Sequence, residues 1–242
     1  MDNTQKLLAI LLPGIDGTGK MFGPLVTHLP EWLDHQVISY PAQDSLSYPE
    51  LAKAVFAKIP ADRSYIIIAE SFAGPLALMI SELANANLKA IVLCATFLTN
   101  PRPWLSKLAP LVLHKWLVGL PPRKWMARAV VTGNDASDEM LERLFDIHKQ
   151  VSPKVLINRL YEVFDVDVRS IFQRCRVPML YLYGTRDHLV LKHSRNEIQQ
   201  ARADVEILSV DGPHFLLQTK PGPCTDVIVK FMQTNAIMGS RG

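Results

Sequence analysis

The chain has 242 residues, 48% of them hydrophobic and 20% charged, and its formal net charge at pH 7 is +3. This composition is that of an ordinary soluble globular protein, and the length fits one domain or one domain with an insertion. The small net charge, without basic residues interleaved with aromatic ones and without helix-turn-helix or finger spacing, gives no indication of a nucleic-acid partner.

The three cysteines, Cys94, Cys175 and Cys224, form no CxxC pair. An odd number without such spacing favours a reducing compartment over a disulfide framework or a zinc site. The apolar run Leu7–Leu12 stops at Pro13, so it is too short for the core of a signal peptide or for a membrane span. We therefore expect a cytoplasmic protein without a transmembrane segment, a bound metal or an organic cofactor.

The N-terminal part of the chain alternates between strand and helix patterns. Continuous apolar runs bounded by turn residues predict buried strands, and apolar residues at helical spacing predict the helices between them. The strands are expected at 6–12, 36–40, 65–69 and 89–94, and the helices at 21–29, 49–59 and 75–86. This alternation implies a parallel sheet with helices on both faces.

The alternation stops between Pro101 and about Cys175, where no convincing strand occurs. Trp and Leu side chains recur there at helical spacing, so we expect them to pack on one another and also to line an apolar pocket as a lid. Trp104 and Leu108 are the pocket candidates from this region. The longer helices are expected at 138–150 and 153–165.

Strand patterns resume after this helical region. Strands are expected at 178–183 and 205–210, and helices at 191–201 and 224–233. The chain therefore divides into an expected core, residues 1–100 and 176–242, and an expected helical cap, residues 101–175.

A glycine-rich loop, PGIDGTGK, follows the first strand at residues 13–20. It looks similar to a phosphate-binding loop, but that motif needs Ser or Thr after the lysine, and here Met21 follows Lys20. The glycines instead allow the backbone to pass close to a ligand with its N–H groups pointing outward.

The third strand leads into AESFAG, in which Ser71 lies between the small residues Ala69 and Ala73. A small residue two positions on either side of a Ser, between a strand and a helix, is the pattern of a nucleophile elbow. Such a tight turn lifts the hydroxyl above the sheet and leaves it at a helix N-terminus. The alternative is a Ser that only caps the following helix.

Asp187 and His214 follow the fifth and sixth predicted strands, so both lie with Ser71 past the carboxyl ends of strands. Open parallel sheets bind their ligands at that edge. Ser, Asp and His in this order match a hydrolytic triad, in which the imidazole takes the proton of the Ser hydroxyl and the carboxylate orients the imidazole. The expected oxyanion-hole donors are the backbone N–H groups of Ile15 and Phe72.

Four segments together resemble a known family: PGIDGTG at 13–19, AESFAG at 69–74, YGTRDHLV at 183–190 and GPHFLLQ at 212–218. Over nearly its whole length the chain resembles the serine esterases of the α/β-hydrolase superfamily. The layout is similar to that of small carboxylesterases and pimeloyl-carrier-protein methyl ester esterases. The first two segments look closer to an esterase/acyltransferase group that includes plant phytyl ester synthases.

The resemblance implies a triad of Ser71, Asp187 and His214, an oxyanion hole of Ile15 and Phe72, and a cap inserted after the fourth core strand. The sequence departs from the family in three places. The first loop begins with Pro13-Gly14 where the family usually has His-Gly, and the elbow has Ala at both small positions. The family's first two antiparallel strands have no room before Leu7. We therefore expect an α/β-hydrolase fold whose mainly parallel, six-stranded sheet lacks those two strands.

Other polar residues have weaker claims to the site. Glu70 is expected to be a buried or capping carboxylate, and Asp165 and Asp167 are alternative acids that lie in the insertion rather than after a strand. Asp16 either orders its loop or touches the substrate. The substrate-pocket candidates outside the cap are Asp16, Leu189 and Phe215.

Between residues 101 and 130 the sequence has basic residues and no acidic one. Such a run is either a solvated helical face or a means of attracting an acidic acyl carrier protein, a CoA phosphate or an anionic membrane surface. The basic residues are Arg102, Lys107, Lys115, Arg123, Lys124 and Arg128.

The sequence favours a serine hydrolase that cleaves carboxylic esters of short or medium acyl chains through an acyl-enzyme on Ser71. The apolar insertion favours such a small-molecule ester over a sugar or a peptide. One alternative is an acyl thioesterase or acyltransferase that acts on acyl-CoA or acyl-carrier-protein with the same triad. A more distant one is a non-catalytic, ligand-binding member of the fold.

Overall fold

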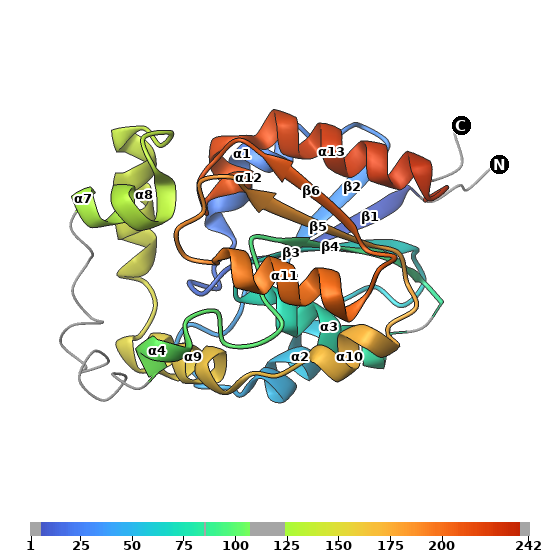
Figure 1. The fold of residues 1–242 in the computed structure, drawn as a ribbon, viewed down its shortest axis with the longest axis horizontal. Helices are drawn as coiled ribbons and strands as arrows, with labels where there is room; N and C mark the ends of the chain where they lie inside the picture. Colours follow the sequence, from blue (N-terminus) through green and yellow to red (C-terminus); the bar gives the residue numbers. More distant parts are fainter. Residues whose placement is uncertain (1–5, 85, 107–123, 238–242) are drawn as a thin grey trace.

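The fold is built on one parallel sheet (Figure 1). A computed structural model describes residues 6–84, 86–106 and 124–237. Across the sheet the strands follow the order β2-β1-β3-β4-β5-β6, and each neighbouring pair is parallel, which confirms the predicted fold class. The strands are β1 (Leu7–Leu12), β2 (Leu33–Val37), β3 (Tyr65–Glu70), β4 (Leu88–Cys94), β5 (Met179–Gly184) and β6 (Glu206–Val210).

Helices cover both faces of this sheet (Figure 1). One face carries α1 (Gly23–Val26), α12 (Leu216–Thr219) and α13 (Pro221–Thr234), with the 3-10 turn η1 (Lys20–Phe22) beside them. The other face carries α2 (Tyr48–Phe56), α3 (Ala73–Leu83), α10 (Arg169–Arg174) and α11 (Lys192–Ala201). Two apolar layers therefore enclose the strands.

The strand sequences explain these two layers, because successive side chains of a strand point to opposite faces. In β1, Leu8, Ile10 and Leu12 belong to the cluster that includes residues of α2 and α3. Leu7, Ala9 and Leu11 belong to the cluster formed with α1 and α13. A strand covered on both faces needs the continuous apolar run seen in the sequence.

The second strand differs from the sequence-based expectation. It was expected at residues 36–40, but β2 begins at Leu33 and ends at Val37. The strand includes the polar residues Asp34, His35 and Gln36, and in the described sheet it is an edge strand that pairs with β1. An edge strand keeps one side in solvent, so polar side chains are tolerated there.

The helix expected at residues 21–29 is mostly absent. Only η1 and the single turn of α1 form, and the chain then turns at Thr27 to His28. Pro30 explains the early end, because a proline disfavours helical backbone in the residue before it. The helix expected at 224–233 begins earlier, at Pro221, since proline is well tolerated in the first turn of a helix.

The described elements between β4 and α10, called the cap below, lie beyond the carboxyl ends of the strands (Figure 1). The helices α8 and α9 match the two long helices expected in this region. The division into a core and a cap stays a prediction, and residues 107–123, including the pocket candidate Leu108, lie outside the described residues. The described cap elements are α4 (Pro103–Ser106), α7 (Lys124–Ala127), the π-helical turn η2 (Arg128–Thr132), α8 (Asp138–His148) and α9 (Pro153–Asp165).

Among the described residues, no helix combines the length and the apolar character that crossing a bilayer would require.

Candidate active site

The candidate site lies where the order of the strands changes direction. The connection from β1 to β2 runs towards one edge of the sheet, and the connection from β2 to β3 returns past β1. At such a switch point the loops after the two central strands separate and leave a crevice at their carboxyl ends. The loop after β1 is the glycine-rich segment 13–20, and the loop after β3 contains Ser71.

The turn at Ser71 is strained and firmly held. Its φ of 52° lies in the left-handed region that residues other than glycine rarely adopt. The Ser71 N–H donates to Cys94 O at 2.8 Å, and its carbonyl accepts from the Gly74 N–H at 3.1 Å and from the Thr96 hydroxyl. A Cβ on Gly74 would come within 2.0 Å of Thr96 Oγ1, so only glycine fits at this first turn of α3.

Ser71, His214 and Asp187 form a continuous chain of hydrogen bonds. Ser71 Oγ lies 3.0 Å from His214 Nε2, and His214 Nδ1 lies 2.8 Å from Asp187 Oδ2. The other carboxylate oxygen, Asp187 Oδ1, accepts the N–H groups of Leu189 at 2.8 Å and Val190 at 3.0 Å. The Asp187 carboxylate is thus fixed on both oxygens and orients the imidazole towards Ser71.

Burial and charge act in opposite directions on these two groups. Burial disfavours the imidazolium, but the Asp187 carboxylate outweighs it through charge and hydrogen bonding and raises the pKa of His214. Burial also disfavours ionised Asp187, but His214 and the two backbone N–H groups outweigh it and lower the pKa of that carboxyl. The pair therefore favours a carboxylate beside an imidazole that readily takes a proton.

Glycine brings the Asp187 and His214 loops together. A Cβ on Gly184, at the end of β5, would lie 2.4 Å from the carbonyl oxygens of both Gly212 and Pro213. The Arg186 N–H also donates to Gly212 O at 2.9 Å. The two loops can approach so closely only because Gly184 has no side chain.

Two backbone N–H groups near Ser71 lack internal partners among the described residues. Within the described residues, neither the Ile15 N–H nor the Phe72 N–H makes a hydrogen bond. The loop that carries Ile15 is closed by the Gly17 N–H, which donates to Gly14 O at 3.0 Å, and Gly17 has a φ of 70°. Asp16 orders this loop, because its Oδ1 accepts the Thr18 N–H at 2.8 Å.

Glu70, next to the nucleophile, is a buried carboxyl group. Burial is the main cause that raises its pKa to about 7, which the nearby His214 and a hydrogen bond from Gln218 oppose. Gln218 Nε2 donates to Glu70 Oε2 at 3.0 Å. The expectation of a buried carboxylate therefore agrees with its environment, although at neutral pH this group is partly protonated.

A mainly apolar pocket of about 290 Å³ opens beside Ser71 and His214. Core loops and cap helices both contribute to it, and three of the predicted pocket residues, Asp16, Leu189 and Phe215, line it. Trp104 does not occur among its described lining residues, and its side chain on α4 is 55% exposed. The apolar lining from the cap consists of Val131, Leu144, Phe145, Leu156 and Leu160.

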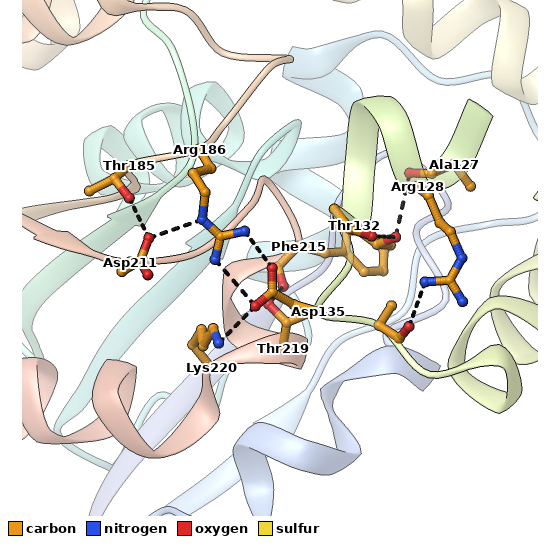
Figure 2. Close-up of polar contacts among 12 residues, drawn as sticks. Ala127, Arg128, Thr132, Asp135, Thr185, Arg186, Asp211, Phe215, Thr219 and Lys220 are labelled. Atoms are coloured by element: carbon orange, nitrogen blue, oxygen red, sulfur yellow. Dashed lines mark hydrogen bonds and ion pairs between the residues drawn. The ribbon is translucent and has the colours of Figure 1, made fainter. Parts of the chain in front are cut away.

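The cap is fastened to the loops that carry Asp187 and His214 (Figure 2). Asp135, between η2 and α8, pairs with Arg186 Nη1 at 2.7 Å and with Lys220 Nζ at 2.8 Å. Arg186 in turn pairs with Asp211 Oδ1 at 3.0 Å. A backbone bond joins the same regions, because the Phe215 N–H donates to Val131 O at 3.0 Å. These contacts join the described cap to the loop that carries Asp187 and to the segment that follows His214.

The alternative acids lie elsewhere. Asp165 is exposed at the end of α9, and Asp167 is exposed and paired with Arg169. His188 and His193 are also exposed, as expected for surface residues. Within the described part of the chain, no group of three or more His, Cys, Asp or Glu residues is arranged to hold a metal ion.

The supporting residues of the site were not predicted from the sequence. Thr96 holds the Ser71 carbonyl, and Tyr40 Oη donates to Pro13 O at 3.0 Å. Arg159 of α9 donates to the carbonyl of Ile15 at 2.7 Å. Only Arg159 left a signal, since a charged residue interrupts the buried stripe of Val155, Leu156 and Val163 on its helix.

No protein-family model matches the chain, and no curated protein matches it. Solved structures match it over nearly its whole length. A hydrolase from Oleispira antarctica has a TM-score of 0.80 at 18% identity, covering 95% of this chain and 91% of that one. An enol-lactonase from Burkholderia xenovorans has a TM-score of 0.78 at 14% identity, covering 96% and 94%. An α/β hydrolase from a Medee basin deep-sea metagenome has a TM-score of 0.76 at 16% identity, covering 96% and 91%.

These likenesses, together with the strand order, show that the chain has the α/β-hydrolase fold. At such low identities they carry no information on the substrate of this protein.

Proposed function

We propose that the protein is a serine hydrolase that cleaves carboxylic esters of short or medium acyl chains through an acyl-enzyme on Ser71. The observation that carries the proposal is the chain of hydrogen bonds from Ser71 Oγ through His214 to the buried Asp187, at the mouth of an apolar pocket. This is the arrangement that turns a Ser hydroxyl into a nucleophile.

The chemistry follows from the geometry of the three side chains. With Nδ1–H donated to Asp187, His214 presents Nε2 as an acceptor to the Ser71 hydroxyl. As Ser71 Oγ attacks the ester carbonyl carbon, Nε2 takes the hydroxyl proton, and it returns that proton to the departing alcohol oxygen when the tetrahedral adduct collapses. A water molecule then attacks the acyl-enzyme by the same route and releases the acid.

The negative charge on the tetrahedral adduct needs donors that are already in place. In this proposal the N–H groups of Ile15 and Phe72 receive the oxyanion, since neither has another partner among the described residues. Phe72 begins the turn into α3, so the positive end of that helix adds to the stabilisation.

The pocket supports an acyl chain of limited length. Its volume of about 290 Å³ lies at the lower end of small-molecule sites, and its lining is mainly apolar. Acyl transfer to an alcohol or thioester cleavage would use the same three side chains. An acidic carrier or CoA at the cap has little support, because the three described basic residues have internal partners. Arg102 donates to Leu189 O, Lys124 pairs with Glu142 and Arg128 pairs with Asp138.

Fluorophosphonate labelling with peptide mass spectrometry tests the nucleophile. We expect one adduct on Ser71, and we expect Ser71→Ala to lose labelling and to lower kcat by roughly 10⁶-fold. Ser81→Ala is the matched control, because Ser81 lies on the helix that follows the elbow and only donates to Leu78 O. This variant should label and turn over like the parent protein.

A panel of p-nitrophenyl esters of graded chain length, beside acyl-CoAs and with or without an added alcohol, tests the substrate class. We expect the highest kcat/KM on short or medium esters, with water as the acceptor. Absence of an adduct on Ser71, with Ser71→Ala behaving like the parent, would refute the hydrolase. If the added alcohol accelerates release of the acyl group, the protein is an acyltransferase instead. If acyl-CoAs are cleaved faster than the esters, it is a thioesterase.

A further inference from the structure

Arg159 is a buried cation that makes no ion pair with any residue that the structure describes. It lies on cap helix α9, is only 3% exposed, and stacks over the ring of Tyr40 at 5.5 Å from the ring centre. Its Nη1 donates to Ile15 O at 2.7 Å and to Asp16 O at 2.9 Å, and its Nη2 donates to Pro41 O at 2.8 Å. Three backbone carbonyls thus replace the carboxylate that usually accompanies a buried arginine.

These contacts are made to the loop that carries one proposed oxyanion donor. The N–H of Ile15 is the proposed oxyanion donor, and Arg159 holds the carbonyl of the same residue. The fit is close, since a Cβ on Gly17 would lie 2.6 Å from Arg159 Nη1. The loop begins with Pro13, which has neither an N–H nor a polar side chain to hold it, so contacts from other elements add to the bonds within the loop.

The same cap helix also reaches the second proposed donor. Glu162 Oε2 accepts the Tyr48 N–H at 2.6 Å. Tyr48 stacks on the Phe72 ring with 4.6 Å between ring centres, and its hydroxyl donates to Phe72 O at 2.8 Å. One face of α9 therefore contacts the Ile15 loop directly and the Phe72 turn through Tyr48.

We propose that Arg159 is a positioning residue of the oxyanion hole, through which cap helix α9 fixes the Ile15 N–H relative to Ser71. The proposal rests on the function proposed above, because it requires that N–H to receive the oxyanion. The planar guanidinium suits this task, since it directs several N–H groups at once to carbonyls in fixed directions. Lysine has a compact charge and a flexible stem, and reproduces this only in part.

A positioning role predicts a loss in kcat rather than in KM. The oxyanion forms only after the attack, so a displaced Ile15 N–H weakens transition-state binding and leaves ground-state binding almost unchanged. A misplaced donor of this kind lowers the rate by about 10- to 100-fold. A residue that only stabilises the fold would instead lower the amount of active protein, with unchanged kinetics for each active site.

The test uses Arg159→Met, which removes every donor but keeps most of the side-chain length, and Arg159→Lys. The first measurement is kcat and KM on a p-nitrophenyl ester, with the concentration of active sites determined by fluorophosphonate titration. The second is the Ki of an alkyl boronic acid that mimics the tetrahedral adduct. We expect Arg159→Met to lower kcat about 10- to 100-fold, with KM nearly unchanged, and to weaken the boronic acid by a similar factor. Arg159→Lys should recover part of both losses.

Arg202→Met is the matched control. Arg202 is also largely buried, donates to the carbonyls of Phe172 and Cys175, and stacks over the Phe172 ring at 5.6 Å, but it lies away from the candidate site. This variant should lose stability without a change in kcat for each site. Hydrogen–deuterium exchange of residues 13–20 gives a readout that needs no turnover, and it should accelerate in Arg159→Met alone.

Equal kcat and equal boronic-acid affinity in Arg159→Met and Arg202→Met would overturn the proposal, and so would unchanged exchange of residues 13–20. If Arg159→Met does not fold, Arg159→Lys decides by the same two measurements, with a smaller expected loss. A parent protein that neither labels nor hydrolyses any ester would refute the proposed function. The exchange of residues 13–20 would still decide whether Arg159 holds the loop.

Discussion

Ser71 keeps its strained backbone because its own backbone N–H and carbonyl groups both have hydrogen-bond partners. A residue in this left-handed region costs about 1–3 kcal/mol and persists only where its surroundings fix it. The Ser71 N–H is fixed by Cys94 O, and its carbonyl by the Gly74 N–H and the Thr96 hydroxyl. The turn is therefore held by β4, by Thr96 two residues after β4 and by α3, and none of these contacts involves His214.

Gly74→Ala should disturb this turn. The new Cβ would lie 2.0 Å from Thr96 Oγ1 and 2.6 Å from Thr96 Cγ2, so Thr96 or the turn must shift. Overpacking of this kind typically costs about 1–3 kcal/mol in unfolding free energy, and we also expect kcat to fall because Ser71 moves. Chemical denaturation and esterase kinetics measure both effects.

Gly23→Ala is the control, since a Cβ there would meet nothing within 4 Å at the start of α1. It should be neutral or slightly stabilising. Adding Thr96→Ala to Gly74→Ala should recover part of the lost stability, because it removes Oγ1 and Cγ2 and leaves only the Thr96 Cβ, 2.7 Å from the new Cβ. Equal stability of the parent protein and Gly74→Ala would show that the turn tolerates a side chain at this position.

The pH dependence of turnover follows from the raised pKa of His214. The imidazole must be neutral to take the Ser71 proton, so kcat/KM should rise with pH, and its midpoint should lie above the ordinary histidine value of about 6.5. The same raised pKa also makes the folding stability depend on pH. The stability from charged His214 is fully present below pH of about 6.5 and is lost as the pH rises through the raised pKa.

Asp187→Asn tests the cause of that shift. It should move the midpoint to lower pH, because burial alone disfavours the imidazolium, and it should lower kcat by roughly 10⁴-fold through the wrong tautomer. A pH-stat assay on a soluble ester measures both. Asp167→Asn, at the alternative acid that pairs with Arg169, should leave the profile unchanged. A shift of the profile in that control would contradict the assignment of Asp187.

Among the elements, the cap differs from the core in how it is held. Its own apolar clusters are small: one is formed by Ala127, Ala136 and Leu141, and another by Val151, Val155 and Leu156. Val163 of α9 belongs to the large core cluster, and polar contacts to the core come from Asp135 on one side and from Arg159 on the other. The position of the cap over the pocket therefore depends on directed polar contacts as well as on apolar packing.

Asp135→Asn should loosen the cap on the His214 side. Hydrogen bonds from Arg186 and then Lys220 hold the pKa of Asp135 at about 2, so the carboxylate is charged throughout the neutral range. Its contribution to stability is present above its unfolded pKa of about 3.9 and is lost only as the pH falls through the folded value. We expect the melting temperature to fall by a few degrees and KM to rise several-fold for the longest accepted acyl chains.

Calorimetry and the graded ester panel check this expectation. The matched control is Asp146→Asn, because among the described residues the Asp146 carboxylate of α8 pairs only with exposed Lys149, the residue after that helix. Exposed pairs of this type contribute little, so the control should resemble the parent protein. If Asp135→Asn and Asp146→Asn behave alike, the Asp135 contacts do not hold the cap. Since Arg186 and Lys220 are partly exposed, added salt should lower the melting temperature of the parent protein towards that of Asp135→Asn.

Helices and strands could be predicted from the sequence where their apolar residues recur with one clear period. The four central strands are continuous apolar runs, and α8 and α9 have a helical apolar stripe, so their positions were predicted to within about two residues. The edge strand β2 and the short α1 were predicted poorly. The polar residues of β2 reflect its position at the edge of the sheet, and Pro30 explains the early end of α1. An argument from apolar periodicity accounts for neither effect.

At the scale of the whole molecule, the fold class was predictable because strands and helices alternate, and the strand order confirms it. The candidate site was predictable in part, because a parallel sheet brings the ends of its strands to one edge. The structure brings Ser71, Asp187 and His214 together there, while their roles stay predictions. Thr96, Tyr40 and Arg159 could not be predicted as neighbours of the site, since their contacts are long-range and leave no spacing in the sequence.

The contacts of α9 have a consequence for protein engineering. Caps of enzymes are attractive parts to exchange, because they line the pocket and join the core at only two points of the chain. Here the helix that supplies Leu156 and Leu160 to the pocket also supplies Arg159 to the loop beneath it. A chimaera with a foreign cap would change the pocket and remove this support at the same time. We therefore expect the chimaera to keep its kcat only when the foreign cap also carries the face of α9 that contains Arg159.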